Sequence, residues 1–506
     1  MSSGAKVARA RAVTLIGLDA HAITVEAEVT QGLPGFSVLG ASGSAGREAA
    51  DRVRAALAAA GCPVGARKVL TSLAPAELPK VGARFDLALA VAVLARLEVL
   101  PPAALEGVVL LGELALDGAV RSVPGVLPSL AALESGDRLL VADDDAAEAA
   151  VSGGSAEIVP ISDLGEAVAV LRGRSTPRRA PEPTAIVPPP VPDLADVQGQ
   201  HEARRALEVA AAGGHHLLFV GPPGCGKSML AERLPGLLPS LDADAALQLA
   251  AIRSVAGLLD PGRAAVLDTR PPFRAPHHGT TQAALLGGGS GIARPGEVSL
   301  AHRGALLVDE LLEWPRRLLD GLREPLQEGV VRVARSRATV RYPAAFQLIA
   351  ATNPCPCGSA DGCRCSVQDL QRYRQRLSGP LVDRLDLAPA VRRLAADDVL
   401  TDHPAERSAE VAERVAAARR TAEERSATAN ADAPIALLRA SCGTGARQGL
   451  AQAVDAGVLT GRGHDRALRV ARTLADLDGR DRMDRADVDE ALGHRLALLA
   501  VEGADR

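Results

Sequence analysis

Apolar and polar positions follow two different periods in the first third of the chain. Residues 22–29, AITVEAEV, alternate apolar and polar side chains as a half-buried strand does, before the turn-forming stretch QGLPG. Residues 45–61 carry apolar side chains at helical spacing and end at a glycine, and residues 85–97, FDLALAVAVLARL, predict a second, buried helix. Residues 107–123 predict two short strands joined by an Asp-Gly turn. Together these elements predict a compact α/β domain over residues 1–172.

The pattern changes twice further along the chain. Residues 173–194 contain STPRRAPEPTAIVPPPVPD, a proline-rich stretch that can form neither a helix nor a sheet ladder, so we expect a linker there. Residues 195–395 alternate strands and helices, as a parallel α/β sheet requires. From 396 to 506 the apolar spacing is helical throughout. The expected fold class is therefore α/β, with a helical domain at the C-terminus.

Composition narrows the class of protein. Of the 506 residues 47% are hydrophobic and 23% are charged, which is ordinary for a soluble globular protein. A net charge of −4 gives no general attraction to nucleic acid, and 2% aromatic residues leave little for base stacking, so any DNA contact must come from a local basic surface. The N-terminus lacks the apolar core of a signal peptide, and the longest apolar run, residues 87–95, is too short to span a bilayer. We therefore expect no membrane partner and a cytoplasmic location.

The strongest motif lies in HHLLFVGPPGCGKSML. A short apolar strand runs into a loop whose glycines let backbone N–H groups turn toward phosphate oxygens, and a helix follows. Lys227 is expected to reach the β- and γ-phosphates of a nucleotide, and the Ser228 hydroxyl to ligate Mg²⁺. Only four of the 57 basic residues are lysines, which makes a lysine at this position informative. The motif predicts an ATP site formed by Gly221, Pro222, Pro223, Gly224, Cys225, Gly226, Lys227 and Ser228.

Two further strands end in polar residues of the kind that nucleotide hydrolysis needs. The strand GALLVDE ends in Asp309, a candidate Mg²⁺ ligand, and Glu310, a candidate base for the attacking water. The strand FQLIAATN ends at Asn353, whose side chain could position that water beside the γ-phosphate. Arg384, in SGPLVDRLDL, could reach the γ-phosphate bound to a neighbouring subunit, which would imply a ring. An ion pair with one of its two flanking aspartates is the alternative for this arginine.

These segments resemble the ComM/YifB-type, magnesium-chelatase-like AAA+ ATPases, and the resemblance covers nearly the whole chain. The segments that carry it are DVQGQHEARRALEVAAAGGHHLLFVGPPGCGKSMLA, PFRAPHHGTT, GGGSGIARPGEVSLAHRGALLVDELLEW, LREPLQEG, ATNPCPCG and SGPLVDRLDL. The resemblance implies an AAA+ core with a C-terminal helical lid, ATP and Mg²⁺ as ligands, and a homo-hexameric ring. It places Asn353 at the sensor-1 position and Arg384 at the arginine finger. Arg462 falls at the sensor-2 position of the lid, with Arg466 and Arg469 close by.

The resemblance extends to the first domain, which is similar to a Lon-peptidase-like (S5-type) fold without its catalytic groups. A Lon-type peptidase needs a serine nucleophile and a lysine base. The corresponding segment here, KVGARFD, has Arg84 at the serine position, and the lysine position falls at Leu127. The resemblance therefore implies a scaffold or a substrate-handling surface.

Two segments of the core are candidates for substrate contact. Residues 271–296 contain His277, His278 and a triple glycine, and they resemble a loop that points into the pore of a ring. Adjacent histidines rarely ligate one ion, so this pair is not expected to form a metal site. Residues 328–346 alternate like a hairpin and resemble the pre-sensor-1 hairpin; its arginines could grip DNA phosphates or form a solvated or inter-subunit charged face. The candidate DNA contacts are Arg332, Arg335 and Arg337, with Arg341 on the same hairpin.

Four of the seven cysteines lie within residues 353–366, NPCPCGSADGCRCS. In this insertion, residues 355–365, four thiolates could close a tetrahedral Zn²⁺ site, with free thiols as the next alternative and a disulfide as the least expected in a reducing cytosol. The hypothesis is a structural zinc clip that braces a catalytic loop. Its ligands would be Cys355, Cys357, Cys363 and Cys365.

The leading functional hypothesis is a ring-forming AAA+ ATPase that couples ATP hydrolysis to translocation or branch migration on single-stranded or branched DNA. The resemblance supplies the DNA part, because the ComM branch of the family is associated with DNA uptake and recombination. The alternative is a chelatase-type motor that remodels a protein partner, whose identity the sequence leaves open. Arg84 and Leu127 disfavour a Lon-like peptidase, and Glu310 together with Arg384 disfavours a purely structural nucleotide-binding module.

Overall fold

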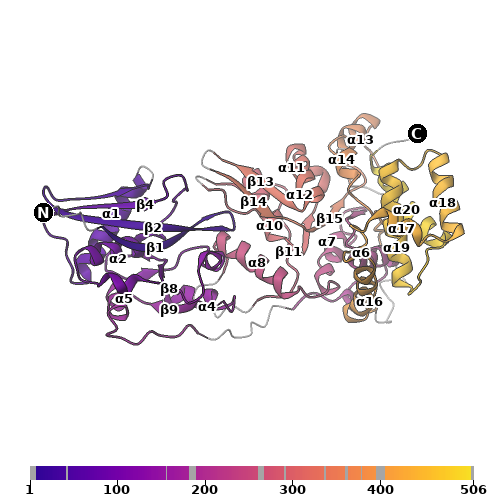
Figure 1. Ribbon diagram of the computed structural model, residues 1–506. Coiled ribbons are helices and arrows are strands. Elements are labelled where there is room, and N and C mark those ends of the chain that lie inside the picture. The colour runs from indigo at the N-terminus through magenta and orange to yellow at the C-terminus, as the bar shows by residue number, and fades with distance from the viewer. Residues whose placement is uncertain are drawn as a thin grey trace.

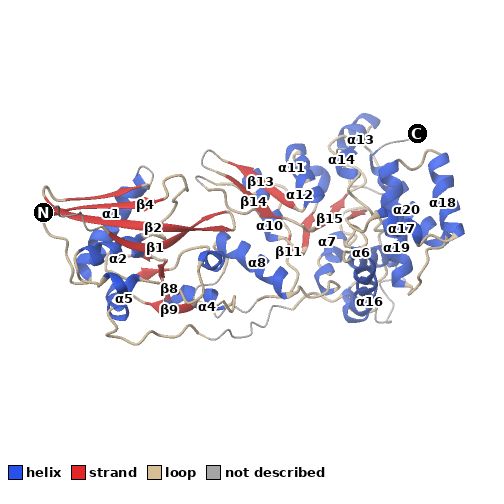
Figure 2. Cartoon of the chain, viewed as in Figure 1, coloured by secondary structure: helices blue, strands red, loops and turns tan. Residues whose placement is uncertain are grey.

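The computed structural model is elongated, with an N-terminal sheet at one end and C-terminal helices at the other (Figure 1). It describes residues 7–41, 44–154, 156–181, 190–259, 267–289, 292–335, 338–358, 363–377, 379–394 and 405–502. Strands and helices are mixed in the part of the chain before residue 395, and the elements after residue 405 are helices (Figure 2). No helix within these ranges is long and apolar enough to cross a lipid bilayer.

The N-terminal region is built on a seven-stranded mixed sheet. Its strands are β1 Ala8–Ile16, β2 Asp19–Gln31, β3 Gly35–Leu39, β4 Arg67–Ala74, β5 Val108–Leu110, β8 Arg138–Ala142 and β9 Glu157–Ile161. They are ordered β3-β4-β2-β1-β5-β8-β9, with antiparallel pairing of β1 with β2 and of β2 with β4, and parallel pairing elsewhere. The strand predicted at 22–29 is confirmed as the middle of β2.

Helices cover both faces of this sheet, because successive side chains of its central strands point to opposite sides. The helices are α1 Ser44–Ala59, α2 Asp86–Arg96, α3 Val126–Ser129, α4 Asp143–Ala150 and α5 Leu164–Leu171. In β5, Val108 packs in one apolar cluster with α1, α2 and α5, whereas Val109 packs in a second cluster with α3 and α4. The helices predicted at 45–61 and 85–97 are confirmed as α1 and the buried α2.

The segment at 107–123 differs from its prediction, since it forms three short strands and not two. β5 joins the large sheet, and β6 Glu113–Leu114 pairs with β7 Val120–Arg121 in a separate antiparallel ribbon that turns through Gly118. A Cβ on Gly112 would lie 2.6 Å from Val120 Cγ1, so the glycine allows the chain to leave β5 and pass close to β7.

The central region confirms the predicted alternation of strands and helices around a parallel sheet. The strands are β10 Leu217–Val220, β11 Phe273–Arg274, β12 Ala305–Val308 and β15 Gln347–Thr352, ordered β10-β15-β12-β11. Residues 387–390 run beside β10 through isolated parallel bridges. The helices are α6 His201–Gly213, α7 Lys227–Ala231, α8 Ala243–Ala256, α9 Gln282–Leu286, α10 Glu297–Leu300, α11 Arg316–Gly321, α12 Arg323–Glu328, α13 Val367–Arg374 and α14 Gly379–Val382. Parallel pairing throughout brings the carboxyl ends of the strands to one edge.

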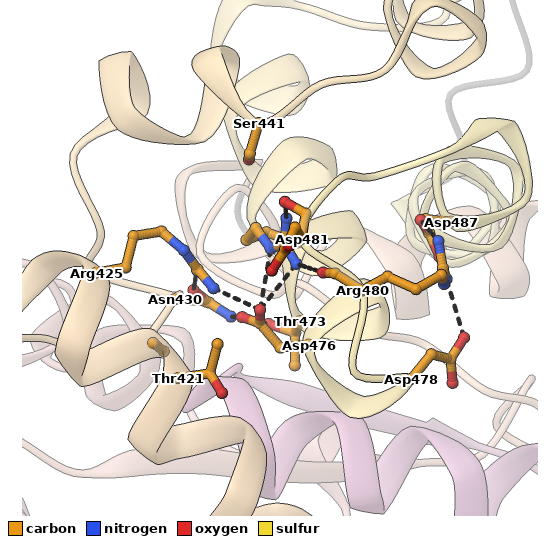
Figure 3. A network of polar contacts seen from close by, with 12 residues as sticks. Thr421, Arg425, Asn430, Ser441, Thr473, Asp476, Asp478, Arg480, Asp481 and Asp487 are labelled. Carbon is orange, nitrogen blue, oxygen red and sulfur yellow. Dashed lines mark hydrogen bonds and ion pairs between the residues drawn. The ribbon is translucent and has the colours of Figure 1, made fainter.

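The C-terminal helices share an apolar core with the central region. They are α16 Ser408–Ser426, α17 Ile435–Ala440, α18 Thr444–Asp455, α19 Gly461–Leu477 and α20 Arg485–Glu502. Leu468 of α19 and Val415 of α16 belong to the same buried cluster as Leu207 of α6. A buried polar network among α16, the loop after α16, α19 and the loop after α19 adds to this packing (Figure 3). One hydrogen bond, 2.8 Å from His215 Nε2 to Thr473 Oγ1, ties α19 to the chain just before β10.

The N-terminal region contacts the central region at α8. The backbone N–H of Gly125, which precedes α3, donates to the carbonyl of Ser254 in α8 at 3.1 Å. The hydroxyl of Ser254 donates to the carboxylate of Glu148 in α4. Ser254 is buried by these contacts.

A second contact joins the β1–β2 turn to a hairpin formed by β13 Val330–Ala334 and β14 Thr339–Pro343. Ile16 and Leu18 pack against the apolar cluster that contains Val340 of this hairpin. A Cβ on Gly17, between them, would lie 2.7 Å from Val340 Cγ1, so the turn approaches the hairpin as closely as a glycine permits. The hairpin predicted at 328–346 is thereby confirmed, and one of its sides touches the N-terminal region.

Candidate active site

Three strand ends bring the predicted nucleotide-site residues together. The loop at 221–228 follows β10, Asp309 and Glu310 follow β12, and Asn353 follows β15. Because β15 lies between β10 and β12, the three ends are neighbours at one edge of the sheet. Hydrogen bonds from Lys227 to Asn353 and from Ser228 to Asp309 connect them directly.

The loop after β10 depends on glycine at its start and in its middle. A Cβ on Gly221 would lie 2.1 Å from the carbonyl oxygen of Val391, a distance that no side chain can adopt. Gly224 and Gly226 have φ values of +76° and +95°, in the left-handed region that residues with a Cβ rarely occupy. The loop therefore has the backbone freedom that a phosphate cradle needs.

Lys227 is buried at the centre of this site. Its ammonium donates to the carbonyls of Gly221 and Pro222, both at 2.8 Å, and to Asn353 Oδ1 at 3.0 Å. Burial lowers the pKa of Lys227, and the nearby Cys225 and Asp309 partly oppose that shift. The oxygens that accept from the ammonium are uncharged, so the buried cation suits an anionic ligand such as a phosphate.

Ser228 and Asp309 offer the oxygen ligands that Mg²⁺ prefers. The Ser228 hydroxyl donates to Asp309 Oδ2 at 2.6 Å, which places a neutral and an anionic oxygen side by side. The other carboxylate oxygen of Asp309 accepts from the backbone N–H of Glu310 at 2.8 Å, and the Asp309 carbonyl accepts from Trp314 Nε1 at 2.8 Å. This pair of oxygen donors fits Mg²⁺. Hydrogen bonds to the carboxylate and to the carbonyl of Asp309 hold this ligand in place.

Glu310 adopts an unusual conformation at the start of the next turn. Its backbone has φ 50° and ψ 45°, a left-handed geometry that costs a residue with a side chain about 1 kcal/mol or more. Its carboxylate Oε2 lies 3.1 Å from Nδ1 of His278, in the segment between β11 and α9. The predicted base is thus already held by a side chain from a neighbouring strand end.

Arg384 and Arg462 lie at the opposite edge of the sheet. Both line a cavity of about 870 Å³ together with His216, which precedes β10, and Gly304, which precedes β12. The phosphate loop follows the other end of β10, and a four-residue strand separates its ends by about 13 Å. The structure therefore groups the predicted sensor-2 residue with the predicted arginine finger, and away from the phosphate loop of the same chain. Arg466 and Arg469 line the same cavity.

Arg384 forms hydrogen bonds with uncharged groups of its own chain. It donates to the carbonyl of Pro380 at 2.6 Å and to the side-chain oxygen of Gln327. The flanking aspartates are paired elsewhere: Asp383 with Arg495 and Asp386 with Arg466. Burial lowers the pKa of Arg384, and the nearby arginines, among them Arg462, lower it further. This cluster of cations suits a second anion.

The hairpin arginines differ in their surroundings. Arg332 forms ion pairs with Glu324 and Glu328, each at 2.6 Å, so its charge is compensated by two carboxylates. Arg335 is exposed at the end of β13, and its guanidinium lies beside Gly288 of the glycine-rich loop. Arg337 lies outside the described residues. Tyr342 of β14 also donates to the carbonyl of Ala293 at 2.7 Å, so the two predicted substrate segments lie side by side.

The four cysteines come together beside the phosphate loop. The sulfurs of Cys355, Cys357, Cys363 and Cys365 all lie within 4.8 Å of one another. Tetrahedral zinc thiolates have sulfurs about 3.8 Å apart, and the Cys355–Cys357 and Cys357–Cys363 distances are 3.3 and 3.7 Å. A Cβ on Gly358 would lie 3.0 Å from Cγ and Cδ of Pro223, so this cluster abuts the phosphate loop.

Arg84 and the segment around Leu127 lie close together in the N-terminal region. Arg84 is buried and donates to Ser129 Oγ at 2.8 Å and to the Gly125 carbonyl at 3.3 Å. Burial lowers the pKa of Arg84 to about 10, although Asp145 and Glu148 oppose the shift. A guanidinium and an alkyl side chain at these two positions supply neither a nucleophile nor a base.

Sequence reasoning missed three contacts at these sites: His278 with Glu310, Gly358 with Pro223, and Arg332 with its two glutamates. One of them had a usable signal. His278 follows β11, and the ends of parallel strands meet at one edge, so the rule that grouped the acids with Asn353 could also have placed His278 there.

Comparison with known proteins finds family matches over most of the chain. Three family models match: magnesium chelatase, subunit ChlI, at residues 193–399; subunit ChlI of Mg-chelatase, at 25–145; and the C-terminal part of the magnesium chelatase subunit ChlI, at 405–495. The three matches cover parts of the central, N-terminal and C-terminal regions respectively.

Full-length relatives give a closer placement. An uncharacterized protein of Mycobacterium tuberculosis is 44% identical over 497 residues, which are 96% of this chain and 98% of the relative. The protein YifB of Escherichia coli is 42% identical over 490 residues, 95% of each chain. The competence protein ComM of Haemophilus influenzae is 39% identical over 501 residues, 96% of this chain and 97% of the relative. The chain therefore belongs to the ComM/YifB-type, magnesium-chelatase-like family of AAA+ proteins.

Proposed function

We propose that this protein hydrolyses ATP at the edge where β10, β12 and β15 end, and that it works as a homo-hexameric ring. The observation that carries the proposal is the separation of two sets of charged side chains. Lys227, Asp309 and Glu310 lie at one edge of the sheet, whereas Arg384 and Arg462 lie at the other. Because one chain cannot bring both sets to one nucleotide, a neighbouring chain would supply the arginines, and a closed ring does so for every subunit.

Each side chain then has a task in hydrolysis. Lys227 exchanges the loop carbonyls for the phosphates, Glu310 accepts the proton of the attacking water, and Asn353 orients that water. Arg384 and Arg462 from the neighbouring chain stabilise the charge that develops on the transferred phosphate.

Ser228 and Asp309 are the residues that would hold Mg²⁺. The bound cation would neutralise phosphate charge during the transfer. Their 2.6 Å hydrogen bond brings the two oxygens together in advance, so little rearrangement of the chain is needed to receive the ion.

The N-terminal region and the C-terminal helices support the central ATPase region. The C-terminal helices serve as the lid, and they share a core with α6 that would couple them to the nucleotide site. The N-terminal region is a Lon-like scaffold without peptidase activity, an assignment supported by Arg84 and Leu127 at the two catalytic positions. The domain limits expected from the sequence, 1–172, 195–395 and 396–506 with a linker at 173–194, remain part of the proposal.

DNA is the substrate that the surface features favour. Arg335 is exposed beside the glycine-rich loop, where a cation could contact a phosphate backbone without reading bases. One full-length relative carries the name competence protein ComM. These observations support translocation or branch migration on single-stranded or branched DNA. Remodelling of a protein partner is the second candidate, favoured by the match to magnesium chelatase subunits.

Steady-state ATP hydrolysis with and without single-stranded and forked DNA tests this proposal. Glu310→Gln serves as the inactive control, and the double variant Arg335→Ala/Arg337→Ala removes the two arginines that are proposed to contact DNA. Arg485→Ala is the control, because Arg485 is also an exposed arginine but lies on α20. We expect several-fold stimulation by DNA in the wild type and in the control, and none in the double variant. An active ATPase that is indifferent to every DNA would instead favour the protein-partner function.

We also propose that the four cysteines hold a structural Zn²⁺. The sulfur distances support tetrahedral coordination, and the proposal places the protein in the cytoplasm, where clustered thiols stay reduced. Metal analysis of protein purified without chelator should find about one zinc per chain, and Cys357→Ser should lose it. Zinc-free wild-type protein would contradict the assignment.

A further inference from the structure

Two arginines of the C-terminal helices hold the backbone on either side of Arg384. Nη1 of Arg466, in α19, donates to the backbone carbonyl of Arg384 at 2.9 Å and to Oδ1 of Asp386 at 2.5 Å. Nη2 of Arg495, in α20, donates to Oδ1 of Asp383 at 2.9 Å. The residue before Arg384, its own carbonyl and the residue two positions after it are therefore all bonded to these helices.

The segment that carries these contacts is anchored to the central sheet. The side chain of Asp386 is 3% exposed, and its Oδ2 accepts from the backbone N–H of His216 at 3.0 Å. The carbonyl of His216, just before β10, accepts in turn from the backbone N–H of Asp386 at 2.9 Å. Leu381 of α14 and Leu498 of α20 belong to one buried apolar cluster, so α20 packs onto the helix that leads to Arg384.

The side chain of Arg384 is held in a different way from its backbone. Its guanidinium donates to the Pro380 carbonyl and to the side-chain oxygen of Gln327, and both acceptors are uncharged. A phosphate oxygen accepts a stronger hydrogen bond from a guanidinium than an uncharged oxygen does, so a phosphate can replace them. A fixed backbone with a side chain that can exchange partners suits a residue that must reach an anion on another chain.

Charge compensation explains only part of this arrangement. A buried carboxylate needs a cation nearby, and Arg466 supplies one to Asp386. The same nitrogen also donates to the carbonyl of Arg384, a bond that charge compensation does not require. Arg495 is 6% exposed and lies outside the set of described residues that line the cavity around Arg384, so it has no direct route to an anion bound there. Its contact with Asp383 acts on the chain and not on a ligand.

We propose that Arg466 and Arg495 are positioning residues that set the backbone of Arg384, so that its guanidinium and Arg462 reach the same nucleotide on the neighbouring subunit. The inference rests on the proposed function in one respect, the action of Arg384 across the subunit boundary. Arg462 and Arg466 lie one turn apart on α19, so the bond from Arg466 fixes the spacing of the two arginines that serve one phosphate. Misplacing a reacting group by about 1 Å can cost about a hundredfold in rate. Arg466→Gln should therefore lower kcat at least about tenfold and leave KM for ATP within about threefold.

Mixed rings test whether this effect belongs to the chain that supplies Arg384. Glu310→Gln chains keep their arginines but cannot hydrolyse ATP, and Arg384→Ala chains keep their nucleotide site but lack the finger. Each variant alone should be nearly inactive. An equal mixture should regain up to about a quarter of the wild-type ATPase rate, because about one interface in four then pairs an intact finger with an intact site.

Arg466→Gln is then added to one chain or to the other. In the Glu310→Gln chain, which supplies the working finger, it should reduce the regained rate at least about tenfold. In the Arg384→Ala chain, which supplies the working site, it should leave that rate within about twofold, and this result also shows that the altered chain folds and assembles. Arg495→Gln should follow the same pattern. Arg466→Lys can donate to both oxygens from one ammonium, so in the Glu310→Gln chain it should restore the rate to within about threefold.

The outcomes separate this inference from the proposed function. A reference mixture that regains no activity would show that Arg384 does not act across subunits, which refutes the ring mechanism and the inference with it. A reference mixture that recovers, with equal effects of Arg466→Gln in either chain, would refute the positioning role alone. Loss of the regained rate with Arg466→Gln but not with Arg495→Gln would assign Arg466 to direct contact with the nucleotide, and this result also overturns the inference.

Discussion

Asp476 lies at the centre of the buried network in Figure 3, and its replacement by asparagine gives a quantitative prediction. Oδ1 accepts from Arg425 at 2.5 Å and from two nitrogens of Arg472 at 2.8 and 3.2 Å, and Oδ2 accepts from Asn430 at 2.7 Å. The side chains of Asp476 and Arg472 are fully buried. Asp476→Asn keeps the shape but removes the one carboxylate among the described residues that is bonded to Arg472; the other partners of Arg472 in that part of the chain are backbone carbonyls.

The expected cost follows from that burial. Removing one partner of a buried ion pair leaves an uncompensated charge and costs about 3–5 kcal/mol. The amide also has a single acceptor oxygen, so one of the N–H groups that now face Asp476 would meet another N–H. A loss of this size is a large part of the roughly 5–15 kcal/mol that stabilises a domain.

Hydrogen–deuterium exchange measured by peptide is the suitable assay, because it reports the stability of α16 and α19 separately from the rest of the chain. Amides of these helices should exchange faster by about two to four powers of ten, since 1.4 kcal/mol corresponds to a factor of ten. Asp478→Asn is the matched control: its pair with Arg480 is half-exposed and should be worth at most about 1 kcal/mol. Acceleration below tenfold in Asp476→Asn, or equal effects of both variants, would refute the reasoning.

Three further predictions test other parts of the molecule. Gly221→Ala should abolish nucleotide binding measured by calorimetry, because its Cβ would lie 2.1 Å from the Val391 carbonyl; retained binding would show that the loop adapts. Gly358→Ala should raise KM for ATP several-fold, because the new methyl group would press on Pro223 of the phosphate loop and the glycine has φ +69°; an unchanged KM would separate the cysteine cluster from the nucleotide site. Burial raises the pKa of Asp86 to about 6 despite its pair with Arg52, so the folded state binds the proton more tightly than the unfolded state. Stability of the N-terminal region should therefore fall by about 2 kcal/mol as pH rises from 4 to 6, and thermal unfolding of Asp86→Asn should lack this slope.

Local sequence patterns were sufficient to predict the helices and strands and one half of the active site, the half at the ends of the strands. The alternation at 22–29 and the helical spacing at 45–61 reappear as β2 and α1, because the apolar face of each element is buried in the same apolar cluster. At 107–123 the pattern gave strands but not their partners, since β5 enters the large sheet and β6 pairs with β7. Pairing depends on segments distant in sequence, which no local pattern contains.

The order of the residues was enough to predict the side of the active site that lies at strand ends. The phosphate loop, Asp309 with Glu310, and Asn353 each follow an apolar strand, and parallel strands end at a common edge, so their meeting follows from order alone. The tertiary structure decided the rest: it set Arg384 beside Arg462 across the sheet, neutralised Arg332 with glutamates, and brought His278 to Glu310. These contacts join side chains through the paths of loops and the packing of helices, and such distances are fixed only when the whole core is assembled.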